Sequence, residues 1–146
     1  GVFQHWDLIE RGWSPGGIWR PVRLERSGPV RIRHHRILCG DATAESATVS
    51  VRLVLDSTDA RTVGIVATAS RDGREVTDHR LSHPLAAGEN QVEFTFGIDQ
   101  PDLWWPWSRG DQPLYDIDVS ITADDESLPS DRVRRRVGMR SVSVDD

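Results

Sequence analysis

The sequence predicts an all-β domain, and three features of its 146 residues support that class. Apolar and polar residues alternate with period two in several segments, as expected for strands with one buried face. No window places apolar residues at helical spacing. Turn residues separate the alternating segments about every ten residues, which is typical of an immunoglobulin-like antiparallel β-sandwich.

Residues 1–18 differ in composition from the rest of the chain. They contain Phe3, Trp6 and Trp13 but show no sustained alternation. We expect them to be a linker or the C-terminal tail of a preceding domain. The sandwich is expected over residues 19–144, with mobile segments only at the two ends of the chain and in the acidic loop 124–131.

Seven or eight strands are expected, each from an alternating segment bounded by turn signals. In the segment 90–98, for example, Val92 and Phe96 face one side while Glu93 faces the other. The same alternation occurs in Val49, Val51, Leu53 and Leu55; in Val63, Ile65, Ala67 and Ala69; and in Tyr115, Ile117, Val119 and Ile121. In chain order the expected strands are 20–26, 29–39, 46–56, 61–70, 74–82, 90–98, 113–123 and 131–143.

One turn and two irregularities are also expected. Asp72-Gly73 is the strongest hairpin signal in the chain. The apolar positions change phase after His34, which predicts a β-bulge near His34 and His35. The phase changes again after Met139, so we expect an edge strand or a bend in the last segment.

Charge and cysteine content argue against several classes of function. The formal net charge is −5 and all 18 basic residues are arginine, which disfavours a nucleic-acid binder and hints at a GC-rich, bacterial genome. The single cysteine, Cys39, excludes an internal disulfide and a multi-thiolate zinc site. No apolar run reaches the roughly 20 residues of a membrane span, so no membrane partner is expected. The compartment stays open, with cytoplasmic preferred over secreted.

Six tryptophans form two clusters, one near the start of the chain and one in a proline-containing loop. The second cluster is Trp104, Trp105 and Trp107. Burying one indole stabilises a fold by about 4–6 kcal/mol, so these side chains are expected to cap the sandwich or pack on a neighbouring domain. A platform that stacks sugar rings remains open as an alternative. Tyr115 begins the next strand and is expected to pin a corner of the sandwich.

The other polar clusters predict neither a catalytic centre nor a metal site, and no cofactor is expected. The run Asp124-Asp125-Glu126 lacks the glycine-punctuated spacing of a calcium loop. His79 and His83 lie on an expected strand, where they would stand roughly 13 Å apart. No Gly-x-Ser-x-Gly elbow occurs. The arginine run from Arg132 to Arg140 is interpreted as a charged edge, or as a partner for acids of a neighbouring domain.

Three segments carry a resemblance to a known family. They are Gly17-Ile18-Trp19-Arg20-Pro21-Val22-Arg23-Leu24, Leu103-Trp104-Trp105-Pro106 with Gln112-Pro113-Leu114-Tyr115, and Val137-Gly138-Met139-Arg140-Ser141-Val142. In order and separation they are similar to the marker segments of glycoside hydrolase family 2, in its β-mannosidase and exo-glucosaminidase branch. The resemblance extends from Trp6 to Val144.

The resemblance implies a middle domain of a longer retaining β-glycosidase. In that family a sugar-binding jelly-roll precedes the immunoglobulin-like sandwich and a catalytic (β/α)₈ barrel follows it. These two domains of the same polypeptide would be the partners, and a β-glycoside would be the substrate of the parent. The barrel supplies both catalytic glutamates, one of them in an Asn-Glu pair, whereas the only asparagine here is Asn90. The fragment alone is therefore expected to be inactive.

The resemblance also implies roles for particular residues. Trp6-Asp7 is similar to the pair through which mannosidase-like members extend the first domain toward the substrate, although Leu8 stands where a tryptophan is usual. The expected docking residues are Trp19, Arg20, Trp104, Trp105, Trp107, Arg109 and Arg140. Two rival interpretations remain: an independent carbohydrate-binding module that uses the indoles, and a plain adhesion-type sandwich.

Overall fold

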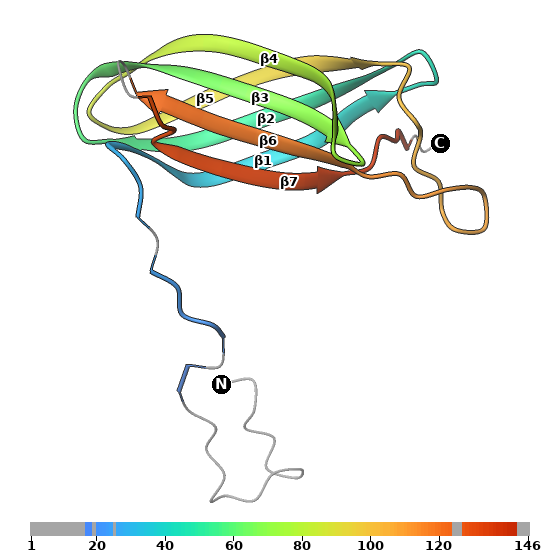
Figure 1. Cartoon of the computed structure of the whole chain (residues 1–146), viewed down its shortest axis with the longest axis horizontal. Helices are drawn as coiled ribbons and strands as arrows, with labels where there is room; N and C mark the ends of the chain where they lie inside the picture. Colours follow the sequence, from blue (N-terminus) through green and yellow to red (C-terminus); the bar gives the residue numbers. More distant parts are fainter. Residues whose placement is uncertain (1–16, 19, 25, 124–126, 143–146) are drawn as a thin grey trace, which may run out of the picture.

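The computed structural model describes residues 17–18, 20–24, 26–123 and 127–142. These residues form two antiparallel sheets packed face to face (Figure 1), which confirms the predicted all-β sandwich. In the described part of the chain, no helix is long and apolar enough to cross a membrane. The strands are β1 (Val30–Ala42), β2 (Ser46–Ser57), β3 (Arg61–Arg71), β4 (Arg74–Leu85), β5 (Gly88–Asp99), β6 (Tyr115–Ala123) and β7 (Asp131–Val137).

One sheet has the order β1-β2-β5 and the other the order β4-β3-β6-β7. β3 and β4 are joined by the predicted Asp72-Gly73 turn, in which both residues have positive φ, 50° and 78°. Positive φ at both central positions matches the right-handed twist of the flanking strands. β7 lies at the edge of its sheet, as the changing phase of the last segment indicated.

The predicted apolar stripes form the core between the two sheets. Val49, Leu53 and Leu55 of β2 are fully buried, and they face Ile65 of β3 and Ile117 of β6 across the sandwich. Their neighbours in sequence point to solvent, because successive side chains of a strand alternate between its two faces. The remaining members of the predicted stripes are buried as well, except Phe94, which is partly buried against the core.

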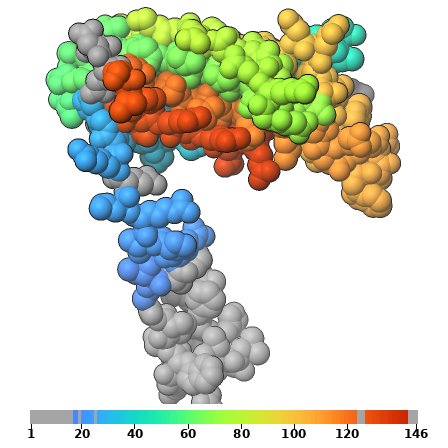
Figure 2. Space-filling view, in the orientation of Figure 1, coloured from blue at the N-terminus to red at the C-terminus, as the bar shows by residue number. Residues whose placement is uncertain are grey.

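The expected strand at 20–26 is wrong for the residues that the structure describes. Residues 20–24 leave the sandwich as an irregular segment without a sheet partner (Figures 1 and 2). The side chains of Val22 and Leu24 are 75% and 101% exposed. Alternating apolar residues predict a strand with one buried face. A strand also needs a hydrogen-bonded neighbouring strand, and no strand among the described residues pairs with residues 20–24.

The strand boundaries differ at several ends. β1 and β4 run three residues further than expected, to Ala42 and Leu85, while β7 stops at Val137 instead of residue 143. The predicted bulge is confirmed, because the β1–β2 register shifts between Ile32 and His34. A second, unpredicted shift lies between Cys39 and Ala42.

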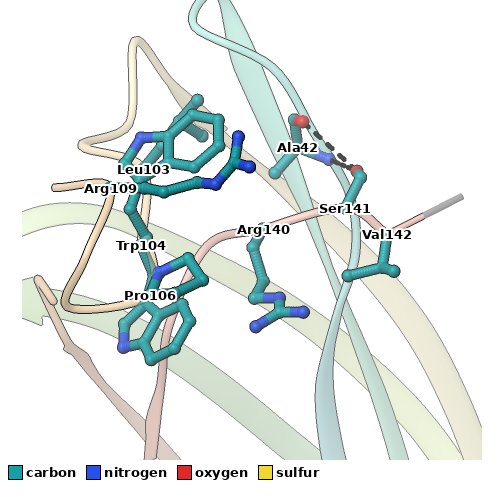
Figure 3. A pocket seen from close by; sticks show the side chains of 9 residues that line it. Ala42, Leu103, Trp104, Pro106, Arg109, Arg140, Ser141 and Val142 are labelled. Carbon is teal, nitrogen blue, oxygen red and sulfur yellow. Dashed lines mark hydrogen bonds between the residues drawn. The ribbon is translucent and has the colours of Figure 1, made fainter.

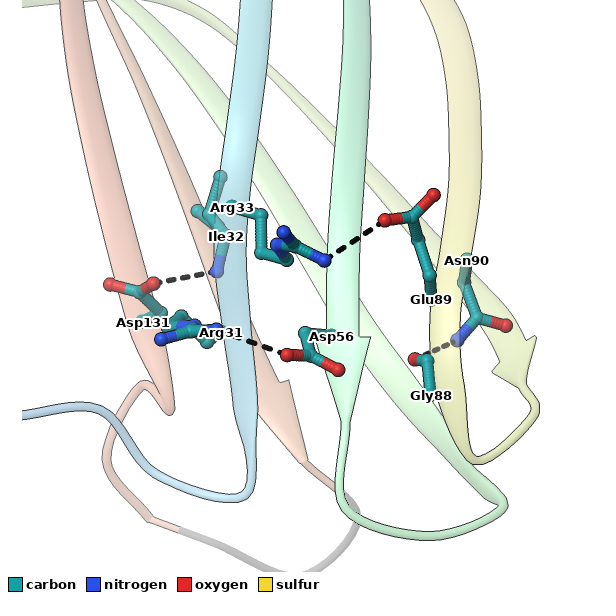
Figure 4. A network of polar contacts seen from close by, with 8 residues as sticks. All are labelled: Arg31, Ile32, Arg33, Asp56, Gly88, Glu89, Asn90 and Asp131. Carbon is teal, nitrogen blue, oxygen red and sulfur yellow. Dashed lines mark hydrogen bonds and ion pairs between the residues drawn. The ribbon is translucent and has the colours of Figure 1, made fainter.

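The chain enters the sandwich through a hydrogen-bonded latch centred on Ser130, which we call the N-terminal latch. The Gly28 amide donates to the Ser130 carbonyl at 2.7 Å, and the Val30 amide donates to Ser130 Oγ at 3.0 Å. The Ile32 amide donates to the Asp131 carboxylate at 2.7 Å (Figure 4). A Cβ at Gly28 would lie 2.4 Å from Ser130 Oγ, so only glycine fits here. Ser130, assigned from the sequence to a mobile loop, is instead 4% exposed and fixed.

β1 and β7 face each other across one open side of the sandwich, where His35 lies near Arg135. Loss of hydration, the Arg135 guanidinium and His34 together lower the pKa of His35 below its usual 6.5. The unfolded chain therefore binds this proton more readily than the folded chain does.

We expect the free energy of unfolding to fall as pH decreases through about 6.5, because only the folded state resists protonation of His35. Replacing His35 with glutamine should flatten this part of the pH profile without abolishing folding. Urea titrations of both proteins between pH 7.5 and pH 5 measure the difference. Parallel profiles for the two proteins would contradict the expectation.

Candidate functional site

The candidate site is built on the loop between β5 and β6, which lies at the end of the sandwich opposite the N-terminal latch (Figure 1). Its base is tied to three other elements. The Gln100 amide donates to the Glu45 carbonyl at 2.9 Å, and the Asp102 amide donates to the Tyr115 hydroxyl at 2.9 Å. The Asp102 carboxylate pairs with Arg71 of the β3–β4 hairpin. The loop is therefore held on a rigid base.

Tyr115 is the residue on which this base depends. Its side chain is 2% exposed, and the Arg71 guanidinium lies 5.9 Å from the ring centroid. Burial raises the pKa of the Tyr115 hydroxyl above its usual 10.0, so the hydroxyl stays protonated and keeps a lone pair for the Asp102 amide. The role of Tyr115 in pinning a corner of the sandwich stays a prediction.

The chain leaves the sandwich through residues 138–141, which the loop holds in place; we call this arrangement the C-terminal clamp. Leu103 and Met139 form a parallel β-bridge, and the Trp104 amide donates to the Met139 carbonyl at 2.9 Å. The Met139 side chain is fully buried in the core. Ser141 Oγ accepts from the Ala42 amide at 2.7 Å and donates to the Ala42 carbonyl at 3.2 Å.

Trp104 is the side chain that closes the clamp. The Arg140 guanidinium lies 5.0 Å from the Trp104 ring, which is the geometry of a cation–π contact. A Cβ at Gly138 would lie 2.8 Å from two atoms of the same indole, so the indole packs directly on the backbone there. Trp104 thus contacts three of the four residues that leave the sandwich, Gly138 and Arg140 through its indole and Met139 through its amide.

The loop and the C-terminal clamp enclose a groove of about 680 Å³ (Figure 3). Trp104 and Arg109 lie on one side, Arg140 and Ser141 lie on the other, and Trp105 also lines the groove. Trp105 and Trp107 are 46% and 87% exposed. Exposed indoles at this density are uncommon on the surface of a monomer and mark a contact surface. Trp107 lies on the loop but does not line the groove.

The arginines fall into two groups, according to whether they pair with a carboxylate of the described residues. On β7, Arg132 pairs with Asp118 at 2.6 Å and Arg134 pairs with Asp116 at 2.6 Å, so these two are neutralised within the domain rather than by a neighbour. The hydrogen bond from Arg134 lowers the pKa of Asp116. Arg109 and Arg140, in contrast, have no carboxylate partner among the described residues.

The structure brings together most, but not all, of the residues expected to dock. Trp104, Trp105, Arg109 and Arg140 meet at the groove, whereas Arg20 does not line it. Trp6, Asp7 and Trp19 fall outside the described residues. No group of three His, Cys, Asp or Glu side chains in the described ranges could hold a metal ion.

Sequence reasoning missed the residues that fix the two junctions. Neither Ser130 nor the pairing of Ser141 with Ala42 was anticipated, because both join positions about 100 residues apart. The one available signal was Gly138, which lies between a strand and a buried methionine. A glycine at such a position often allows another group to approach the backbone closely.

Comparison with known proteins places these features in a family. The family model described as glycosyl hydrolases family 2 matches residues 30–140. Beta-mannosidase B of Aspergillus niger is 31% identical over 147 residues, and these cover 96% of this chain. An exo-beta-D-glucosaminidase of Hypocrea jecorina is 31% identical over 90% of the chain. This chain spans only 16% of the length of each of these two relatives.

A solved structure supports the same assignment. The exo-chitosanase of Amycolatopsis orientalis superimposes with a TM-score of 0.61 and 27% sequence identity. The match covers 82% of this chain and 14% of that chain. The two relatives from the sequence comparison are fungal, so the bacterial origin suggested by the arginine content stays a prediction.

Proposed function

The chain belongs to family 2 of the glycosyl hydrolases, and from this membership we propose that it is a non-catalytic scaffold domain of a longer, retaining β-glycosidase similar to the β-mannosidases. Its role is mechanical. It spaces and orients a preceding sugar-binding jelly-roll, joined through residues 1–18, against a catalytic barrel that follows. In the parent, one barrel carboxylate attacks the anomeric carbon and a second protonates the leaving oxygen, with net retention.

The C-terminal clamp is the observation that carries this proposal. Three consecutive residues each contact the end of the sandwich: Met139 and Arg140 contact Trp104, and Ser141 contacts Ala42. A flexible linker would need none of these contacts, whereas a domain that sets the direction of the next domain needs all of them. The N-terminal latch likewise fixes the chain where it enters the sandwich, at residues 28–32.

Two carboxylates of the described residues, Asp59 and Asp116, are unsuited to general-acid catalysis. A glycosidase general acid needs a raised pKa, which burial usually supplies. Asp116 and Asp59 instead accept hydrogen bonds from Arg134 and Arg61, which lower the pKa of each carboxyl group. Both carboxylates remain ionised at neutral pH and are already engaged, so neither suits proton donation to a leaving group.

A carbohydrate-binding module is the second candidate, and the exposure of Trp105 and Trp107 favours it. An indole face suits the C–H groups of a pyranose ring. However, Trp104 is not available for such a platform, because Arg140 lies over its ring and its edge packs on Gly138. The three-indole platform is thereby reduced to two side chains, which weakens this candidate relative to the scaffold.

We expect the purified 146-residue chain to release no nitrophenol from aryl β-mannosides above the buffer rate, while the full-length parent does. In the parent, Trp104→Ala should lower kcat/KM by roughly tenfold or more, because loosening the clamp misplaces domains that together form the substrate site. Val76→Ala, an exposed change on β4, is the matched control. Hydrolysis by the isolated chain, or wild-type kcat/KM in the Trp104 variant, would refute the scaffold role.

A further inference from the structure

The groove beside the C-terminal clamp holds two positive charges that the described residues leave uncompensated. Arg109 comes from the β5–β6 loop and Arg140 from the segment that leaves the sandwich, and both line the same groove (Figure 3). Eight other arginines of the described residues pair with a carboxylate, including Arg71 at the base of the same loop. Two like charges in one groove repel each other unless an anion lies between them.

The rest of the groove lining indicates what kind of anion fits. Trp105 is half-exposed and Val142 is 68% exposed, so exposed apolar side chains line the groove together with the two guanidinium groups. The Ser141 hydroxyl is engaged with Ala42 and is not offered to a ligand. A carboxylate on an apolar surface satisfies both features, because a guanidinium binds carboxylate through two parallel hydrogen bonds.

The position of the groove indicates where that carboxylate comes from. Arg140, Ser141 and Val142 line the groove and are the last described residues before the chain continues. The chain spans only 16% of the length of its relatives, so a following domain in the parent would lie beside this groove. The two arginine charges, the exposed indole and the direction in which the chain leaves the sandwich therefore all favour an acidic side chain of the following domain as the occupant of the groove.

We propose that this groove is the seat of an aspartate or glutamate side chain from the domain that follows residue 142 in the parent, held between Arg109 and Arg140. The inference rests on the proposed scaffold function and adds the chemistry of the contact. Trp105, which lines the groove, would shield this ion pair partly from solvent, and such shielding strengthens an ion pair relative to an exposed one. The contact fixes the register of the two domains because a bidentate pair is directional.

The test compares the double variant R109Q/R140Q with the wild type, in both the full-length parent and the 146-residue chain. R74Q, on the exposed tip of the β3–β4 hairpin, is the matched control for loss of an arginine. Thermal unfolding is followed by calorimetry at low and high salt. A third measurement titrates the 146-residue chain with glucuronate-containing oligosaccharides while tryptophan fluorescence is recorded.

If the inference is correct, the double variant lowers the melting temperature of the sandwich in the full-length parent and makes that temperature less dependent on salt. The same variant leaves the isolated chain within about 1 °C of the wild type, and R74Q changes neither. An equal shift in the isolated chain would overturn the inference, because the arginines would then act within the sandwich. Saturable glucuronate binding that the double variant abolishes would also overturn it, in favour of an acidic-sugar site.

These outcomes separate the inference from the function on which it rests. The domains of the double variant could still unfold together at an unchanged melting temperature. That result would refute the proposed carboxylate site in the groove and leave the scaffold role intact. Loss of activity in the Trp104 variant tests the scaffold role, because that variant loosens the clamp while both arginines remain, whereas R109Q/R140Q removes the charges and leaves the indole in place.

Discussion

Replacing Met139 with alanine is expected to lower the free energy of unfolding by about 2–5 kcal/mol. The Met139 side chain is fully buried, and its backbone forms both the bridge to Leu103 and the hydrogen bond to Trp104. Truncation leaves a cavity at the point where the loop, β7 and the core meet. Urea unfolding of the 146-residue chain, followed by tryptophan fluorescence, measures the loss.

Met139→Leu is the matched control, because a swap of similar volume usually costs less than about 1.5 kcal/mol. The backbone bonds of the clamp survive in both variants, so the difference between them reports side-chain packing alone. A loss below about 1 kcal/mol for the alanine variant would show that the clamp is not built into the core. In that case the rigidity proposed for the C-terminal junction would lack its main support.

Replacing Ser130 with alanine is expected to cost about 1–3 kcal/mol, because the buried Val30 amide loses its acceptor. Val30 is fully buried and Ser130 is 4% exposed, so water replaces the missing hydroxyl only at a cost. The backbone bond from Gly28 to the Ser130 carbonyl does not depend on the side chain and should remain. The variant therefore isolates the contribution of one hydroxyl group.

Two measurements check the Ser130 prediction. Urea unfolding gives the total cost, and amide hydrogen exchange at Val30 should accelerate more than exchange in β3, which lies away from the latch. Ser82→Ala, at an exposed position of β4, is the control for loss of a serine hydroxyl. Unchanged exchange at Val30 together with a stability loss no larger than that of the control would reject the latch.

Met139 and Ser130 lie at opposite junctions of the domain, and this placement connects stability with the proposed function. A scaffold domain fixes the relative positions of its neighbouring domains only if its two ends are as rigid as its core. Both ends of this sandwich are joined to the core by side chains that are almost completely buried. Mutations at the junctions are thus expected to loosen the parent enzyme even though no catalytic group is touched.

The sequence by itself determined the sandwich and its core. Val49, Ile65 and Ile117 could be assigned to the interior because a strand alternates faces with a strict period of two, and burial follows directly from that period. The Asp72-Gly73 turn was equally readable, since few residue pairs accept positive φ at both positions. The family resemblance rested on short contiguous segments, which are also local in sequence.

Only the tertiary structure decided how the chain enters and leaves the sandwich. The bond between Val30 and Ser130 joins residues 100 apart, and the bond between Ala42 and Ser141 joins residues 99 apart. No local pattern predicts such pairs, because each depends on where two edge strands end after folding. The same reason explains why the strand expected at 20–26 is wrong. The alternating residues predicted an apolar face, but whether a neighbouring strand is available for pairing depends on the tertiary structure.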